Sequence, residues 1–148
     1  MTSTEAEATG DEFVELAIAG IDLGPEDARP AIGTVQLVDM ASGDRLDIVM
    51  ARADALSIQQ AVASQDPPRP KTHDLVLAAV QSLGGTVASA RILDRRTGGV
   101  FVAELVLRAP DGNELFLDAR PSDALNVALR AGSATLWANA ALLAAALN

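Results

Sequence analysis

The chain has 148 residues, 49% of them hydrophobic, which is enough to bury roughly two-thirds of its unfolded surface around one core. It has no cysteine, so disulfides, thiolate nucleophiles and zinc–thiolate sites are excluded. Its net charge is -9, so binding a polyanion would require a local basic patch or bound divalent cations.

The first half of the chain predicts a three-stranded antiparallel meander followed by a helix. Residues 1–11 are polar and acidic and are expected to form a disordered tail, with a single domain over residues 12–148. Apolar patterns and turn residues predict a strand from Phe13, strands over 34–40 and 45–50, and a helix over 54–63.

The second half predicts another meander between helices. A helix over 73–83, with Thr72 as N-cap, precedes strands over 86–93, 100–108 and 114–118. A helix starting at Pro121 or Ser122, a strand over 135–138 and an alanine-rich helix capped by Asn139 follow. Neighbouring strands that pair in meanders, packed with helices, indicate an α+β fold rather than a doubly wound parallel sheet.

The sequence predicts no membrane association. Its longest apolar stretch near the C-terminus, residues 136–147, is too short to cross a bilayer, and the acidic N-terminus does not resemble a signal peptide. We therefore expect a cytoplasmic protein.

The segment Asp118-Ala-Arg-Pro-Ser-Asp123 marks a turn from a strand into a helix. Pro121 suits the first helical turn and Ser122 is expected to cap it. One interpretation is structural, a capped turn closed by an Arg–Asp ion pair. The other is that Asp118 and Asp123 ligate Mg²⁺ or Mn²⁺ while Arg120 holds a phosphate.

The segment Arg69-Pro-Lys-Thr-His-Asp74 marks a second, similar helix start. His73 is the only histidine, which excludes a multi-histidine metal site. A lone histidine at a helix start is more often structural than catalytic, but His73 or Asp74 could transfer a proton. Arg69 and Lys71, with Arg120, would supply the local basic patch.

These two segments, in this order and with Phe101-Val-Ala-Glu-Leu105 between them, resemble the signature of the bifunctional nuclease domain family. The resemblance covers roughly residues 46–143, and Asp54 falls where the family often has glutamate. It implies an α+β domain that self-associates, and some members of the family cleave both RNA and DNA. Carried over to this chain, it implies the site residues Arg69, Thr72, His73, Asp74, Asp118, Arg120, Ser122 and Asp123, and Lys71 joins them as a candidate for binding substrate through its charge.

The sequence thus supports two functional hypotheses. The first is a nuclease of low sequence specificity acting on RNA or DNA, assisted by Mg²⁺ or Mn²⁺ and without an organic cofactor. Asp118 and Asp123 would bind the metal, His73 or Asp74 would transfer a proton, and Arg69 and Arg120 would bind phosphate. The second is a non-catalytic homo-oligomeric binding module in which the Arg-Pro motifs are structural. Convergence of Asp118, Asp123, His73 and Asp74 on a solvent-open pocket would favour the first. Burial of these residues in closed ion pairs with Arg69 and Arg120 would count against it.

Overall fold

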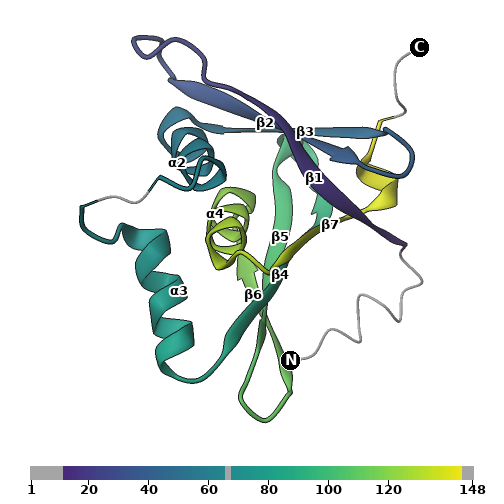
Figure 1. Cartoon of the computed structure of the whole chain (residues 1–148). Helices are drawn as coiled ribbons and strands as arrows, with labels where there is room; N and C mark the ends of the chain where they lie inside the picture. Colours follow the sequence, from purple (N-terminus) through teal and green to yellow (C-terminus); the bar gives the residue numbers. More distant parts are fainter. Residues whose placement is uncertain (1–11, 66–67, 145–148) are drawn as a thin grey trace.

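The computed structural model describes residues 12–65 and 68–144, which form the predicted α+β fold (Figure 1). In this part of the chain, a seven-stranded sheet has the order β3-β2-β1-β7-β4-β5-β6. The strands are β1 (Phe13–Asp22), β2 (Ile32–Asp39), β3 (Arg45–Ala51), β4 (Thr86–Arg95), β5 (Phe101–Arg108), β6 (Glu114–Ala119) and β7 (Thr135–Asn139). The helices are α2 (Arg52–Val62), α3 (Thr72–Ser82) and α4 (Pro121–Ala131), with short 3₁₀ turns η1 (Thr97–Gly99) and η2 (Ala140–Leu142). The predicted tail, residues 1–11, lies outside the described residues.

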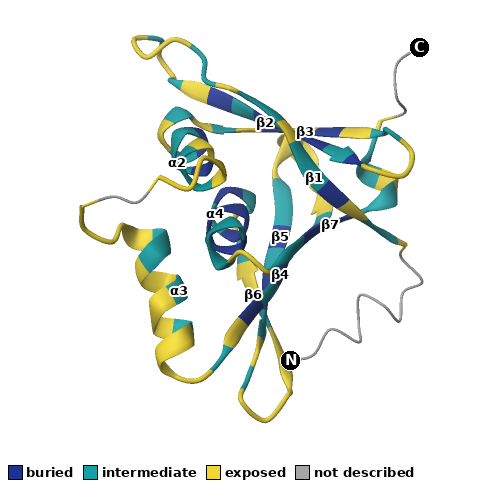
Figure 2. Ribbon diagram, viewed as in Figure 1, coloured by how far each residue is buried: buried dark blue, intermediate teal, exposed yellow. Residues whose placement is uncertain are grey.

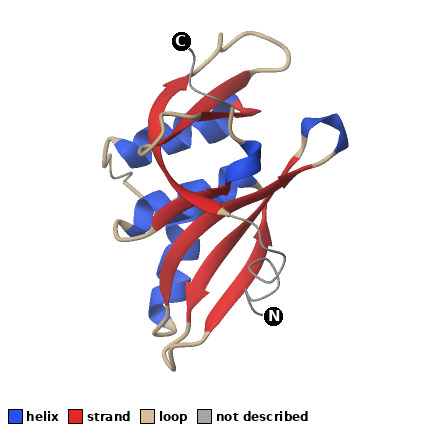
Figure 3. Cartoon of the chain, turned by 90° about the vertical axis from the view of Figure 1, so that its right-hand side faces the viewer, coloured by secondary structure: helices blue, strands red, loops and turns tan. Residues whose placement is uncertain are grey.

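Both predicted meanders are confirmed, and β7 joins them. β1, β2 and β3 pair antiparallel, as do β4, β5 and β6. β7 pairs antiparallel with β1 and parallel with β4, so Leu136 is opposite both Leu16 and Ala90. The strands form one twisted layer, with the helices along one side of it (Figures 1 and 3).

The core lies between the sheet and α4, which is the most buried of the described helices (Figure 2). Alternate strand residues point into it, as the period of two requires. α2 contributes Ala55 and Ile58, both fully buried. In contrast, α3 has no buried residue, and its Leu75 is 63% exposed. No helix in residues 12–65 and 68–144 combines the length and apolarity needed to span a bilayer.

Two predictions about helix ends are wrong, and a third is confirmed in part. Thr72 is the first residue of α3 and not its N-cap; Lys71 takes that place, and its backbone N–H donates to Asp74 at 2.9 Å. Ser122 does not cap α4, because Arg120 is the N-cap residue and Ser122 is the buried second residue of the helix. Asn139 does cap the segment after it, but within the described residues that segment is only the 3₁₀ turn η2.

Candidate functional site

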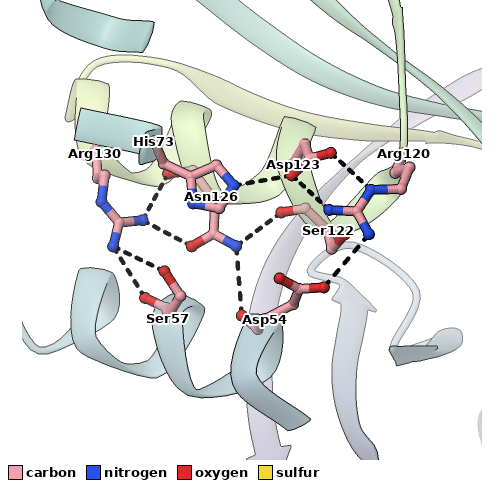
Figure 4. A network of polar contacts seen from close by, with 8 residues as sticks. All are labelled: Asp54, Ser57, His73, Arg120, Ser122, Asp123, Asn126 and Arg130. Atoms are coloured by element: carbon pink, nitrogen blue, oxygen red, sulfur yellow. Dashed lines mark hydrogen bonds and ion pairs between the residues drawn. The ribbon is translucent and has the colours of Figure 1, made fainter. Parts of the chain in front are cut away.

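Each of the three described helices carries an aspartate at its third position: Asp54 in α2, Asp74 in α3 and Asp123 in α4. A carboxylate there is favoured by the positive end of the helix dipole. Contacts made by Arg120 and His73 bring the first turns of these helices together (Figure 4). The result is a charged cluster at one edge of the helical layer.

Arg120 and Asp123 form a two-pronged ion pair. Arg120 Nε donates to Asp123 Oδ2 at 2.8 Å, and Nη2 donates to Oδ1 at 2.9 Å. Hydrogen bonding from Arg120 is the main reason that the pKa of Asp123 is lowered, and the same pairing raises the pKa of Arg120. The side chain of Arg120 is nevertheless 64% exposed. Its guanidinium is therefore held in place while it remains open to a ligand in solvent.

His73 lies on the other side of Asp123. Its Nε2 is 2.9 Å from Asp123 Oδ1, and its side chain is only 14% exposed. This contact also lowers the pKa of Asp123. Asp123 thus links a largely covered imidazole to an exposed guanidinium.

Behind this cluster, Arg130 organises a buried network that the sequence analysis did not foresee. Its side chain, 10% exposed, donates to Asp74 Oδ1 at 3.0 Å, to Asn126 Oδ1 at 2.7 Å and to Ser57 Oγ at 3.1 Å. Asn126 is fully buried and donates to the backbone oxygens of Ser122 and Asp54. The network connects α2, α3 and α4 and fixes the backbone from which Asp54 and Asp123 project.

A hollow of about 310 Å³ opens next to Arg120. Arg120 and Asp54 supply charged groups to its wall, with Arg120 Nη1 3.6 Å from Asp54 Oδ2. Most of the remaining wall is apolar and includes Val49, Met50, Val100 and Phe101. The hollow can therefore receive an anionic group beside Arg120 and an apolar or planar group next to it.

The arrangement does not fit a resident metal ion. Both oxygens of Asp123 already accept hydrogen bonds, from Arg120 and from His73. Residues 12–65 and 68–144 contain no group of three or more histidine, aspartate or glutamate side chains that could hold a metal. A hard divalent ion requires several oxygen ligands, which this cluster does not supply as arranged.

Comparison with known proteins identifies the family. Residues 35–147 match the family described as Bifunctional nuclease domain. The chain belongs to this family. It is 34% identical over 119 residues to two relatives in Mycobacterium tuberculosis, Uncharacterized protein MT1877 of strain CDC 1551 / Oshkosh and Uncharacterized protein Rv1829 of strain ATCC 25618 / H37Rv. The aligned region is 80% of this chain and 67% of each relative. Membership suggests nuclease-like function, and neither relative's name describes an activity.

The structure gathers only some of the site residues that the bifunctional nuclease resemblance implied. His73 and Arg120 each contact Asp123, and Asp74 lies in the network behind them. Asp54, Ser57, Asn126 and Arg130 were not among the predicted site residues. A polar residue on the apolar face of α4, such as Asn126, was the available signal for a buried network.

Asp118 lies on the opposite face of the sheet from Asp123. It pairs with Glu104 across β5 and β6, while its neighbour Ala119 pairs with Ala103 in the core beneath the helices. Because successive strand residues point to opposite faces, the carboxylate of Asp118 points away from α4. The structure therefore does not bring together the two predicted metal ligands.

The basic residues of the first motif also remain outside the cluster. Arg69 and Thr72 are exposed at the start of α3, and Lys71 Nζ donates to Gln60 Oε1 at 3.2 Å. Ser122 lines the hollow next to Arg120 but is buried. Of the residues assigned to phosphate, Arg120 is the one that faces the hollow.

Proposed function

We propose that this domain is a nuclease that cleaves RNA or DNA phosphodiesters with low sequence specificity, using the hollow next to Arg120. The observation that carries the proposal is the pairing of an exposed, oriented guanidinium with a carboxylate, Asp54, in the wall of one hollow. Family membership supports the reaction class.

Arg120 is the proposed phosphate ligand. Its planar guanidinium can donate two parallel hydrogen bonds to phosphate oxygens and can offset charge that develops in the transition state. Asp123 and His73 hold the guanidinium from behind, which reduces the conformational entropy lost when phosphate binds. In this scheme Asp123 and His73 are positioning residues.

Asp54 is the proposed proton acceptor. The sequence-based hypothesis assigned proton transfer to His73 or Asp74, but neither lines the hollow. Asp74 accepts hydrogen bonds from Arg130 and from the backbone of Lys71, which favours a bracing role. Asp54 is 22% exposed and next to Arg120, where it could take a proton from an attacking hydroxyl or water. The scheme uses no metal ion, because the carboxylates of Asp54, Asp74 and Asp123 do not form a group that could hold one.

The apolar wall supports low sequence specificity. Val49, Val100 and Phe101 offer surface for stacking and van der Waals contact to any base. Base discrimination usually relies on donors and acceptors directed at base edges. A wall of this kind would bind the sugar and the base without distinguishing one base from another.

The proposal is tested by cleavage of single-stranded RNA and DNA with purified protein in Mg²⁺, in Mn²⁺ and in EDTA. We expect Asp54→Asn and Arg120→Lys each to lower kcat/KM by about a hundredfold or more. Arg45→Lys is the matched control, because Arg45 forms a similarly exposed pair with Asp47, at 3.5 Å, and does not line the hollow. Equal activity in all variants would indicate a contaminating nuclease and refute the proposal. The EDTA arm tests the expectation of Mg²⁺ or Mn²⁺ assistance.

One observation favours the alternative of a non-catalytic binding module. Both Asp123 and Asp74 are already engaged in ion pairs, which a structural role would equally require. Complete absence of cleavage by folded wild-type protein, with retained binding of an anionic ligand at Arg120, would support that alternative.

A further inference from the structure

The face of the sheet opposite the helices has its own hollow, of about 270 Å³. The chain has three phenylalanines, one tryptophan and no tyrosine. Phe13, Phe116 and Trp137 all line this one hollow, from β1, β6 and β7. Phenylalanine is among the residues most often buried in proteins, and tryptophan is highly buried on average. Here neither Phe13, Phe116 nor Trp137 belongs to the hydrophobic core cluster, whereas Phe101 packs against it.

The polar groups in this hollow are held in fixed positions. The guanidinium carbon of Arg91 lies 4.1 Å from the centre of the Phe13 ring, and Nη1 lies 3.1 Å from Glu104 Oε2. Trp137 Nε1 donates to Thr135 Oγ1 at 2.8 Å, which fixes the edge of the indole. Arg91 is 7% exposed, so contacts with Phe13 and Glu104 rather than with solvent hold its guanidinium in place. Rings and polar edges are thus arranged before any ligand arrives.

We propose that this hollow binds a nucleobase, either in a single-stranded nucleic acid or as a free nucleoside. Strand-borne aromatic rings on an open sheet face are an established way to stack bases of single strands. Ser89, Arg91 and Glu114 at the wall can donate to and accept from the edge of the base. The inference rests on the proposed function only in taking nucleic acid as a substrate, since the two hollows lie on opposite faces of the sheet.

Charge favours a base over a phosphate as the group recognised. Arg91 is paired with Glu104, and Arg108 is paired with Glu114 at 3.0 Å. Glu15 lies opposite Trp137 in the β1–β7 ladder, and Asp118 lies opposite Glu104. Because the arginines on this face are already paired with glutamates, the face does not neutralise a run of phosphates. Stacking on the aromatic rings must therefore provide most of the affinity for nucleic acid. Binding here should therefore depend only weakly on salt.

Trp137 provides the measurement, because it is the only tryptophan. Its fluorescence is followed in Asp54→Asn protein, to prevent cleavage, during titration with a deoxyadenosine hexamer, with an abasic hexamer and with adenosine. We expect saturable quenching by the deoxyadenosine hexamer and none by the abasic hexamer. Quenching by adenosine as well would assign the affinity to the base alone, and quenching by the hexamer only would show that the strand is needed.

Phe116→Leu removes the ring but keeps apolar volume, and it should weaken hexamer binding about tenfold. Leu117→Ala is the control, since Leu117 follows in β6 and faces the opposite side of the sheet. Thermal melting of both variants checks folding, and Trp137→Phe with a labelled hexamer tests binding independently.

Three results would overturn the inference. They are no quenching, equal quenching by the abasic hexamer, and a change in the tryptophan emission with protein concentration in the absence of ligand. The last result would mean that a second copy of the chain covers the hollow. If the wild type cleaves nucleic acid but the titrations show no quenching, the proposed nuclease stands and the base site is refuted. If the titrations show quenching but the wild type does not cleave, the base site stands and the proposed nuclease is refuted.

Discussion

Asp123 links two side chains that the sequence motifs contribute, those of Arg120 and His73. One carboxylate oxygen is shared by Arg120 and His73, and the other is bonded to Arg120 alone. Such a carboxylate works chiefly in its ionised form, because protonation would remove acceptor capacity on which both partners depend. Its ionisation is therefore coupled both to the orientation of Arg120 and to folding.

This coupling predicts how stability depends on pH. The pKa of Asp123 is lower in the folded protein than its ordinary value of 3.8. The wild type should therefore be more stable than Asp123→Asn at pH values above 3.8, and the difference should vanish as the pH falls through the folded pKa. Because solvent screens a pair this exposed, we expect a difference of only about 0.5–1 kcal/mol. Urea unfolding from about pH 7 down to about pH 2 measures it. A gap between wild type and Asp123→Asn that does not change with pH would contradict the assignment.

Burial should make Arg130 far more costly to replace than Arg120. Arg130→Met would leave Asp74 and the buried Asn126 without their shared donor, and we expect it to lower the free energy of unfolding by about 3 kcal/mol or more. Arg120→Met breaks an exposed pair and should cost about 1 kcal/mol or less. Combining Arg130→Met with Asp74→Asn should cost less than the sum of the two. Additive costs in denaturant unfolding would contradict a coupled network.

Sequence reasoning identified half of this site because some of the signals are local. His73, Arg120 and Asp123 are in helix-start motifs that can be recognised from adjacent residues alone. Asp54 and Arg130 act through partners on other helices, and no local pattern states which helices will touch. The error over Asp118 was avoidable, because alternation in β6 already places it on the side of Phe116, opposite Ala119.

At the scale of elements, α3 and α4 have the same length but different anchoring. α4 has six buried residues, whereas α3 has none: its Leu77 and Val80 are only partly buried against the core, and polar contacts hold its first turn. Most helical stability in proteins comes from packing of the apolar face. The first turn of α3, which holds His73, therefore depends on the ion pairs of the cluster.

We expect α3 to open locally while the rest of the domain stays folded. Its amides should exchange hydrogen faster than those of α4 by at least about tenfold, because local opening exposes little apolar surface. Mass spectrometry of deuterium uptake in native protein measures both helices in one experiment. Arg130→Met should speed exchange in α3 further, since it releases Asp74. Equal protection of α3 and α4 would show that α3 unfolds only with the whole domain.

Apart from the alanine-rich helix expected after Asn139, which in the described residues is the short turn η2, the strands and helices were predictable to within a few residues, because periodicity and turn residues are local properties of the chain. What joins the two meanders was not predictable. β7 was recognised as a strand, but its pairing with both β1 and β4 depends on contacts between distant segments. That pairing also creates the open aromatic face, since it places β7 next to β1 and so puts Trp137 in one hollow with Phe13 and Phe116.

For the whole molecule, the remaining expectation is self-association, and the edge strand β6 is where we expect it. Leu115 and Leu117 are 45% and 46% exposed on β6, whose outer edge pairs with no other described strand. An exposed edge with apolar side chains readily pairs with a second chain. Leu117→Glu should shift sedimentation equilibrium from dimer towards monomer. Val62→Glu, at a 51% exposed apolar position on α2, is the control and should leave the mass unchanged. A wild type that stays monomeric at high concentration, or a dimer insensitive to Leu117→Glu, would rule out this edge as the contact.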